Sequence, residues 1–97
     1  MNSMDAKLSL MNGMLGQVTP SLRLIAFKMG KSIKVVFVYK SDASDYDTEC
    51  ASEIATQLCA DIDDGSMVDE TVVKDDKLTW KDFPDYEIAF MMNEKLA

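Results

Sequence analysis

The amino-acid sequence predicts an α+β fold in which a mainly antiparallel four-stranded sheet and its helices form a two-layer sandwich. Two stretches repeat apolar residues at helical spacing, and four runs alternate in the way that strands do. The first two strand-like runs are separated by three residues, a length typical of a β-hairpin. The element order is therefore helix-strand-strand-helix-strand-strand, which favours helices packed on a sheet. The pattern leaves open whether both helices share one face of that sheet, and it gives no strand order beyond the first hairpin.

The length of 97 residues and the lack of a linker indicate a single domain over residues 1–97. The net charge is -7, so direct binding of nucleic acid is not expected, because a polyphosphate would be repelled. Residues 1–41 carry about +5 and residues 42–97 about -12. No apolar run is long enough for a membrane span, and no leader pattern is visible. We therefore expect a cytoplasmic protein that binds a basic partner.

Residues 4–15 are predicted to form the first helix, with Ser3 as a possible cap at its start and Gly16 just past its end. An apolar row at helical spacing predicts the face that docks on the sheet. This row consists of Leu8, Met11, Leu15 and Val18. Gly13 lowers the helix propensity by up to about 1 kcal/mol relative to Ala, so docking rather than local propensity is expected to stabilise this helix.

Residues 22–29 and 33–40 are predicted to be the two strands of the hairpin. The second strand is apolar on both faces, because Val36 and Val38 alternate with another row of large side chains. That row consists of Ile33, Val35, Phe37 and Tyr39. A strand of this kind is either central in its sheet or carries an interaction surface on its second face.

An acidic amphipathic helix is predicted at residues 45–62. The surrounding stretch 42–64 holds eight Asp or Glu residues and no Lys or Arg. Ser44 and Asp47 have the spacing of a capping box, and the first turns are acidic, as the helix dipole favours. The acids at the other end oppose the dipole, so we expect that local stability does not explain them. They are Asp61, Asp63 and Asp64.

The remaining chain is predicted to contain a strand at 67–74, a charged loop at 75–84 and a last strand at 86–92. The loop holds two large apolar side chains, Trp80 and Phe83. They either fold back over the core or, in the case of Trp80, anchor an interface, since aromatic residues often carry binding energy. The many methionines are interpreted first as core filler and second as an adaptable binding surface.

Catalytic and metal chemistry have little support in the sequence. The chain has no His, which excludes Ser-His and Cys-His nucleophile pairs and His-ligated zinc. The run from Asp61 to Gly65 resembles the start of a calcium loop, but the twelfth position holds Val72 where a bidentate Glu is needed. No pair of carboxylates stands out for glycoside hydrolysis. We therefore predict a protein that is not an enzyme and has no cofactor or metal.

Four short segments resemble a family of small acidic bacterial proteins over roughly residues 15–92. They are Val18-Thr19-Pro20-Ser21-Leu22-Arg23, Val36-Phe37-Val38-Tyr39, Ala51-Ser52-Glu53-Ile54-Ala55-Thr56 and Ala60-Asp61. The family is identified as immunity proteins of toxin systems, particularly of contact-dependent growth inhibition. The resemblance implies a cytosolic protein that binds and blocks a cognate toxin domain, often a nuclease, with RNA and tRNA among the candidate substrates. The acidic-Phe-Pro stretch usual in the family is replaced here by residues 62–65, so the toxin is not identified.

The predicted partner-binding residues are the outward acids of the second helix together with the loop tryptophan. They are Asp45, Glu49, Glu53, Asp61, Asp63, Asp64 and Trp80. The partner is expected to be a basic toxin nuclease domain, bound by a monomer. Three alternatives stay open: solvated acids that only keep the protein soluble, a scaffold domain that homodimerises through a strand edge or through residues 33–40, and, third, an enzyme.

Overall fold

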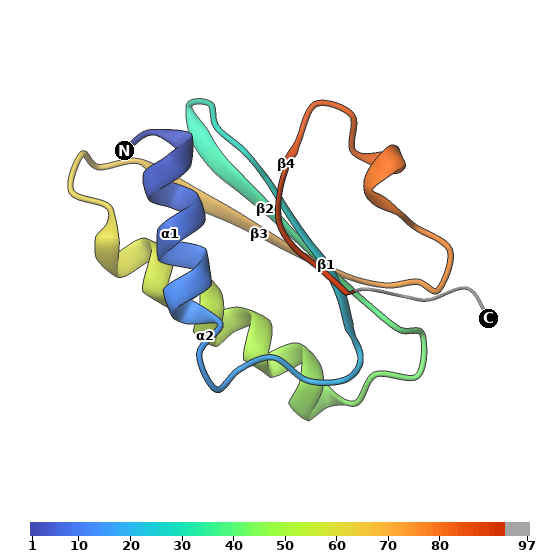
Figure 1. Cartoon of the computed structure of the whole chain (residues 1–97). Coiled ribbons are helices and arrows are strands. Elements are labelled where there is room, and N and C mark those ends of the chain that lie inside the picture. The colour runs from blue at the N-terminus through green and yellow to red at the C-terminus, as the bar shows by residue number, and fades with distance from the viewer. Residues whose placement is uncertain (93–97) are drawn as a thin grey trace.

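The computed structural model describes residues 1–92, which form an α+β fold with two α-helices and a four-stranded sheet (Figure 1). The elements in order are α1 (Ser3–Gly13), β1 (Leu22–Lys28), β2 (Ser32–Tyr39), α2 (Asp45–Asp61), β3 (Met67–Lys74), a 3-10 helix η1 (Trp80–Asp82) and β4 (Glu87–Met91). The predicted α+β class is confirmed. The short helix η1 lies in the segment that was predicted to be a loop.

The sheet is mixed and has the order β3-β2-β1-β4. β1 runs antiparallel to both β2 and β4, which confirms the predicted hairpin and the mainly antiparallel character. β2 and β3 run parallel, because α2 carries the chain back across the sheet between them. β2 is therefore an inner strand, which is the first of the two alternatives that its apolar faces left open.

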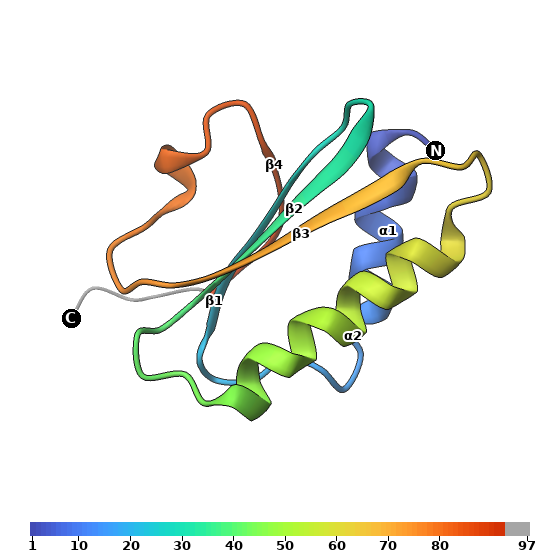
Figure 2. The ribbon, with the colours of Figure 1, turned by 180° about the vertical axis from the view of Figure 1, so that it is seen from behind.

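Both helices pack against the same face of the sheet (Figure 2), which answers the question that the sequence left open. The larger core cluster lies between them and the strands. It joins Ala6 and Leu10 of α1, Ile54 and Leu58 of α2, and Phe27, Phe37 and Tyr39 of the sheet. Burial of these side chains provides the main favourable contribution to folding.

The opposite face of the sheet is partly covered by residues 75–86. Leu78, Phe83 and Tyr86 pack on a smaller cluster formed by Leu24, Val36 and Val38. The rings of Phe83 and Tyr86 meet edge to face at 5.6 Å, a favourable aromatic geometry. Arg23 is buried below this segment, and its Nη1 donates hydrogen bonds to the carbonyl oxygens of Asp75 at 2.7 Å and Leu78 at 2.9 Å.

The orientation of α1 is the reverse of the prediction. The buried residues are Ala6, Ser9 and Leu10, whereas Leu8, Met11, Leu15 and Val18 are exposed. The reason is a close crossing with α2: a Cβ at Gly13 would lie 2.9 Å from the carbonyl oxygen of Ile54. Only small side chains fit such a crossing, so the bulky row is turned outward.

The ends of α1 also differ from the prediction. The N-cap is Asn2, which forms a capping box with Asp5, and not Ser3. The helix ends at Gly13, two residues before the predicted end, and Gly16 has a φ of 76° in the turn that follows. That left-handed conformation is one that glycine adopts without strain.

The hydroxyl group of Tyr39 is buried and has no hydrogen-bond partner among residues 1–92. Burial raises the pKa of this phenol to about 12. Because a buried polar group without a partner lowers stability, Tyr39→Phe is expected to raise the free energy of unfolding by about 1 kcal/mol, as measured by urea titration. Tyr46→Phe, on an exposed ring, is the matched control and should change nothing. A less stable Tyr39→Phe variant would show that the hydroxyl has a partner.

Candidate partner-binding site

The start of α2 is fixed by the predicted capping box. The Asp47 amide donates to Ser44 Oγ at 3.2 Å, and the Ser44 amide donates to Asp47 Oδ2 at 3.0 Å. The backbone N–H of Ser44 is the main cause of a lowered pKa at Asp47, and hydroxyl donors at Ser21 and Thr19 lower this pKa further. The predicted capping box and the helix start at Asp45 are therefore confirmed.

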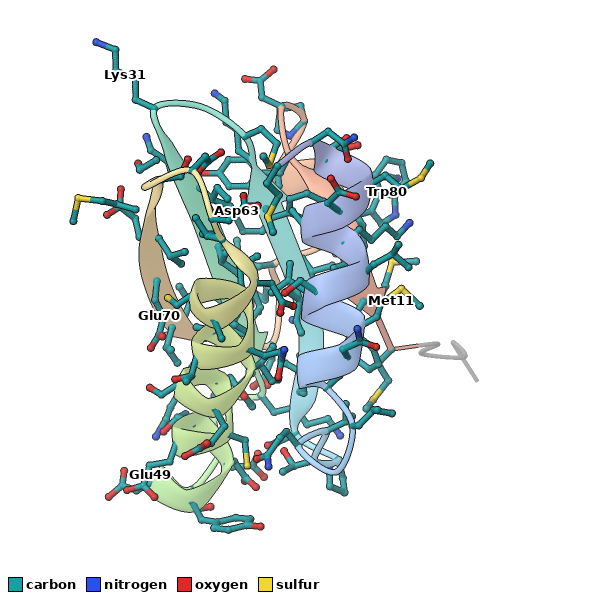
Figure 3. All side chains as sticks on the ribbon, turned by 90° about the vertical axis from the view of Figure 1, so that its left-hand side faces the viewer. Met11, Lys31, Glu49, Asp63, Glu70 and Trp80 are labelled. Carbon is teal, nitrogen blue, oxygen red and sulfur yellow. The ribbon has the colours of Figure 1, made fainter. Side chains whose placement is uncertain are left out.

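Three acids form a row on the outer side of α2, and we name Asp45, Glu49 and Glu53 the acidic row. They are exposed and are spaced four residues apart, on the side of the helix opposite its buried residues. Glu49 extends away from the helix pair (Figure 3). Within residues 1–92, the three carboxylates make no ion pair and no hydrogen bond. The acidic row is therefore available to a basic partner.

A fourth acid next to α2 was missed by the sequence analysis. Glu70 lies on β3 and its Oε1 accepts a hydrogen bond from Ser52 Oγ at 3.0 Å, so it lies beside the helix (Figure 3). The pair Asp69-Glu70 within a predicted strand was visible in the sequence. Its position beside α2 depended on the parallel pairing of β3 with β2, which no local pattern indicated.

Asp61 holds the two helices together. Its Oδ2 accepts a hydrogen bond from Ser9 Oγ at 2.6 Å, and Gln57 Nε2 donates to both of its oxygens at 3.2 Å. The Ser9 hydroxyl, followed by Gln57, lowers the pKa of this carboxyl. Its contribution to stability is therefore complete above about pH 4 and is lost as the pH falls through the lowered pKa.

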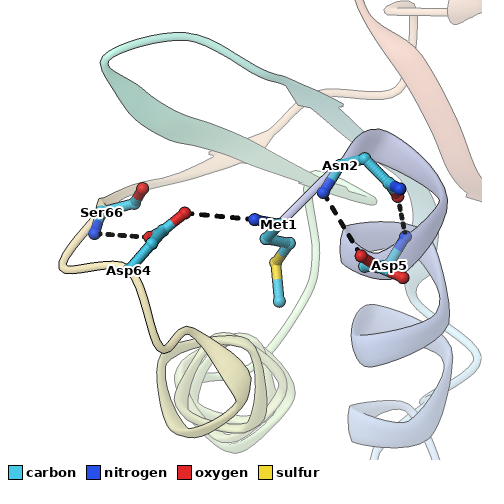
Figure 4. A network of polar contacts seen from close by, with 5 residues as sticks. All are labelled: Met1, Asn2, Asp5, Asp64 and Ser66. Atoms are coloured by element: carbon cyan, nitrogen blue, oxygen red, sulfur yellow. Dashed lines mark hydrogen bonds and ion pairs between the residues drawn. The ribbon is translucent and has the colours of Figure 1, made fainter.

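Asp64 also has partners within the chain (Figure 4). Its Oδ2 lies 3.1 Å from the α-amino group of Met1, and its Oδ1 accepts from the Ser66 amide at 2.9 Å. The hydrogen bonds from Ser66 and then the amino group lower the pKa of Asp64, and Asp64 in turn raises the pKa of that amino group. Tertiary contacts, which the local pattern does not indicate, therefore account for Asp61 and Asp64. Asp63 is exposed and makes no hydrogen bond within the described part of the chain.

Trp80 lies in η1, apart from the acids of α2. Residues 75–86 cover the sheet face opposite the two helices. The indole is 51% exposed, and Lys81 Nζ lies 5.8 Å from its ring centroid. Phe83 packs on the smaller core cluster, in agreement with the prediction that the loop folds back over the core. Trp80 does not bury its ring. The structure therefore does not bring Trp80 together with the acidic row.

Large apolar side chains are exposed along the outward side of α1 and in the turn that follows it, and the sequence analysis had placed three of them, Leu8, Met11 and Leu15, in the row that faces the core. We name this row the α1 stripe: Met4 is 70% exposed, Leu8 53%, Met11 46% and Leu15 78%. Met11 extends from the side of α1 that faces away from α2 (Figure 3). Met14 and Met29 do pack on the core, so the interpretation of methionine as core filler holds for some of these residues and not for Met4 and Met11.

Metal chemistry is not supported by the positions of the acids. Asp61 and Asp64, both in the segment that resembles a calcium loop, bond to different partners. Among residues 1–92, no group of Cys, Asp or Glu side chains is arranged to hold a metal ion. Neither helix of this part of the chain combines the length and apolar character that crossing a bilayer demands.

Comparison with known proteins supplies the family. A search of the curated proteins found no match. A family model described as MafI2 immunity protein matches residues 4–93, which includes all of α1 except Ser3, the whole of α2, all four strands, the acidic row and the α1 stripe. The match extends over nearly the whole chain and agrees with the family resemblance of its short segments. This protein therefore belongs to the MafI2 immunity protein family.

Proposed function

We propose that this immunity protein neutralises a nucleic-acid-cleaving toxin domain in the cytosol by binding its basic surface through the acidic row of α2. The proposal treats residues 1–97 as one non-enzymatic domain in a system of contact-dependent growth inhibition. The observation that carries it is the acidic row itself. Three neighbouring carboxylates without a cation repel one another, and a basic partner relieves that repulsion.

A nuclease is the toxin class that this surface suits best. An enzyme that holds phosphate groups needs Lys and Arg around its active site. An acidic surface attracts such a site over several ångströms and raises the association rate, which selects a basic partner from others. An immunity protein benefits from fast association, because each free toxin molecule remains active until it is bound.

The double variant Glu49→Gln, Glu53→Gln tests this proposal. We expect its association rate with the cognate toxin domain to fall about tenfold at low salt, with a weaker dependence on salt than wild type. Stopped-flow fluorescence at several salt concentrations measures both. Asp61 is left unchanged, since its hydrogen bonds to Ser9 and Gln57 join the helices.

The matched control is Asp85→Asn, Glu87→Gln, which removes the same charge from exposed acids at the β4 side of the sheet. This control should retain most of the association rate. Equal rates for wild type and the α2 variant would exclude the acidic row as the toxin contact.

The alternative, a scaffold domain that self-associates, named two surfaces: a strand edge and residues 33–40. The second of these surfaces is covered within the fold. β2 lies inside the sheet, and both of its faces are buried in the two core clusters. The outer edge of β3 has no partner strand within residues 1–92 and could template a second chain. Sedimentation of the isolated protein over the micromolar range tests that route.

A further inference from the structure

The α1 stripe has no role in the fold. The side of α1 that faces the core is made of Ala6, Ser9, Leu10 and Gly13, and the stripe lies opposite to it. Four of the ten large apolar side chains that are exposed in residues 1–92 belong to this one row. A contiguous exposed apolar row of this kind marks an interaction surface more often than it serves the fold.

The acidic row alone does not make a tight interface. Charges across an interface raise the association rate and help to select the partner, but they contribute less to affinity because both sides must lose their hydration. Affinity comes mainly from a few large side chains that become fully desolvated at the centre of the interface. On α2, Tyr46 follows Asp45 and is 69% exposed, whereas Thr56 and Ala60, which also flank the acidic row, are small, so α2 offers a single large anchor.

The α1 stripe supplies further large apolar anchors from the neighbouring helix. α1 and α2 lie side by side on the same face of the sheet (Figures 2 and 3). Their contact is close, because the Ser9 hydroxyl donates to Asp61 and Gly13 lies against the backbone of Ile54. Glu49 and Met11 lie on opposite flanks of the helix pair (Figure 3). A partner that contacts both rows must therefore cover the outer side of both helices, with acid at one margin of the contact and apolar side chains at the other.

We propose that the α1 stripe is the affinity-determining contact for the same toxin domain, whose surface combines an apolar groove with a basic rim. This inference rests on the proposed function and assigns a different kinetic role to each helix. The acidic row sets the association rate, and Leu8 and Met11 set the dissociation rate by entering the groove at the i, i+3 spacing of a helix. The net charge of this chain favours a basic toxin over a second copy, because two chains of net charge -7 repel each other.

The test compares Leu8→Gln, Met11→Gln with Met67→Gln, Val72→Thr, a control that changes exposed apolar side chains on β3. The probe is the same cognate toxin domain that tests the acidic row. We expect the α1 variant to dissociate about 100-fold faster while its association rate stays within about threefold of wild type. The β3 control should match wild type in both rates. Both variants should unfold at the wild-type denaturant concentration, because the replaced side chains are exposed.

Three results would overturn the proposal. An unchanged dissociation rate for the α1 variant, while the α2 charge variant slows association, rejects the stripe and leaves the proposed function intact. Failure of the wild-type protein to bind the toxin would reject both the proposed function and the assignment of the α1 stripe to the toxin. A wild-type dimer in sedimentation equilibrium that Leu8→Gln, Met11→Gln converts to a monomer assigns the stripe to a second copy of this chain.

Discussion

Leu10→Ala is expected to lower the free energy of unfolding by about 2–5 kcal/mol, because it removes a fully buried side chain and leaves a cavity. Leu8→Ala, two residues earlier, should change it by less than about 0.5 kcal/mol, because Leu8 is exposed. Both changes replace Leu by a better helix former in the middle of α1, so helix propensity favours both variants equally. Urea titration followed by circular dichroism measures the two values.

This pair of variants decides which side of α1 faces the core. The sequence spacing puts Leu8 in the core row and Leu10 outside it, whereas the structure has the reverse. A large loss of stability for Leu8→Ala with little change for Leu10→Ala would restore the sequence-based orientation. That outcome would also remove the α1 stripe as a binding surface.

Arg23→Met is expected to lower the free energy of unfolding by about 2–3 kcal/mol. The variant keeps much of the aliphatic volume but leaves the carbonyl oxygens of Asp75 and Leu78 without the charged donor that now holds them. Hydrogen bonds to a charged group contribute more than neutral ones, and a buried carbonyl that loses its donor is destabilising. Residues 75–86 should then detach more easily from the second face of the sheet.

Trp80 reports this change directly, since it is the single tryptophan of the chain and lies in the segment that Arg23 holds. We expect its emission to shift to longer wavelength in Arg23→Met, together with faster amide exchange at Leu78 and Phe83. Lys40→Met is the matched control, because it removes the same charge from an exposed side chain. Wild-type stability in Arg23→Met would show that packing alone holds residues 75–86.

The elements with strong local signals could be predicted from the sequence. Ser44 and Asp47 gave the start of α2 because a capping box depends on residues three positions apart. The hairpin followed from a three-residue connection, and the inner position of β2 followed from its apolar faces. The acidic row was recognisable for the same reason, since spacing along one helix places Asp45, Glu49 and Glu53 on one side.

The orientation of α1 could not be predicted, because periodicity counts apolar residues and does not weigh the distance between helices. Ala6, Ser9 and Gly13 face α2 because the two backbones come close there, and that closeness depends on the tertiary structure. The same applies to Asp61 and Asp64. Their partners Ser9 and Met1 lie more than fifty residues away in the chain.

The pairing of the strands was also beyond local sequence signals. The parallel alignment of β2 and β3 results from the crossover through α2, and it places Glu70 beside the acidic helix. An irregularity in the pairing of β1 with β4 lies between Ile25 and Ala26, which pair with Phe90 and Ile88, so the regular alternation of faces is broken at this point of β4. Ile88 consequently joins the smaller core cluster, while Phe90 packs on the larger one.

The position of β4 at the far edge of the sheet has a consequence for how the chain folds. β4 pairs with β1, where Leu24 meets Met91, so one edge of β1 stays open until nearly the whole chain has been made. The hairpin and the β2-α2-β3 unit can form earlier from nearby segments. Closure of the sheet by so distant a pair is expected to be the slow step of folding, and a truncated nascent chain would expose the edge of β1 to aggregation.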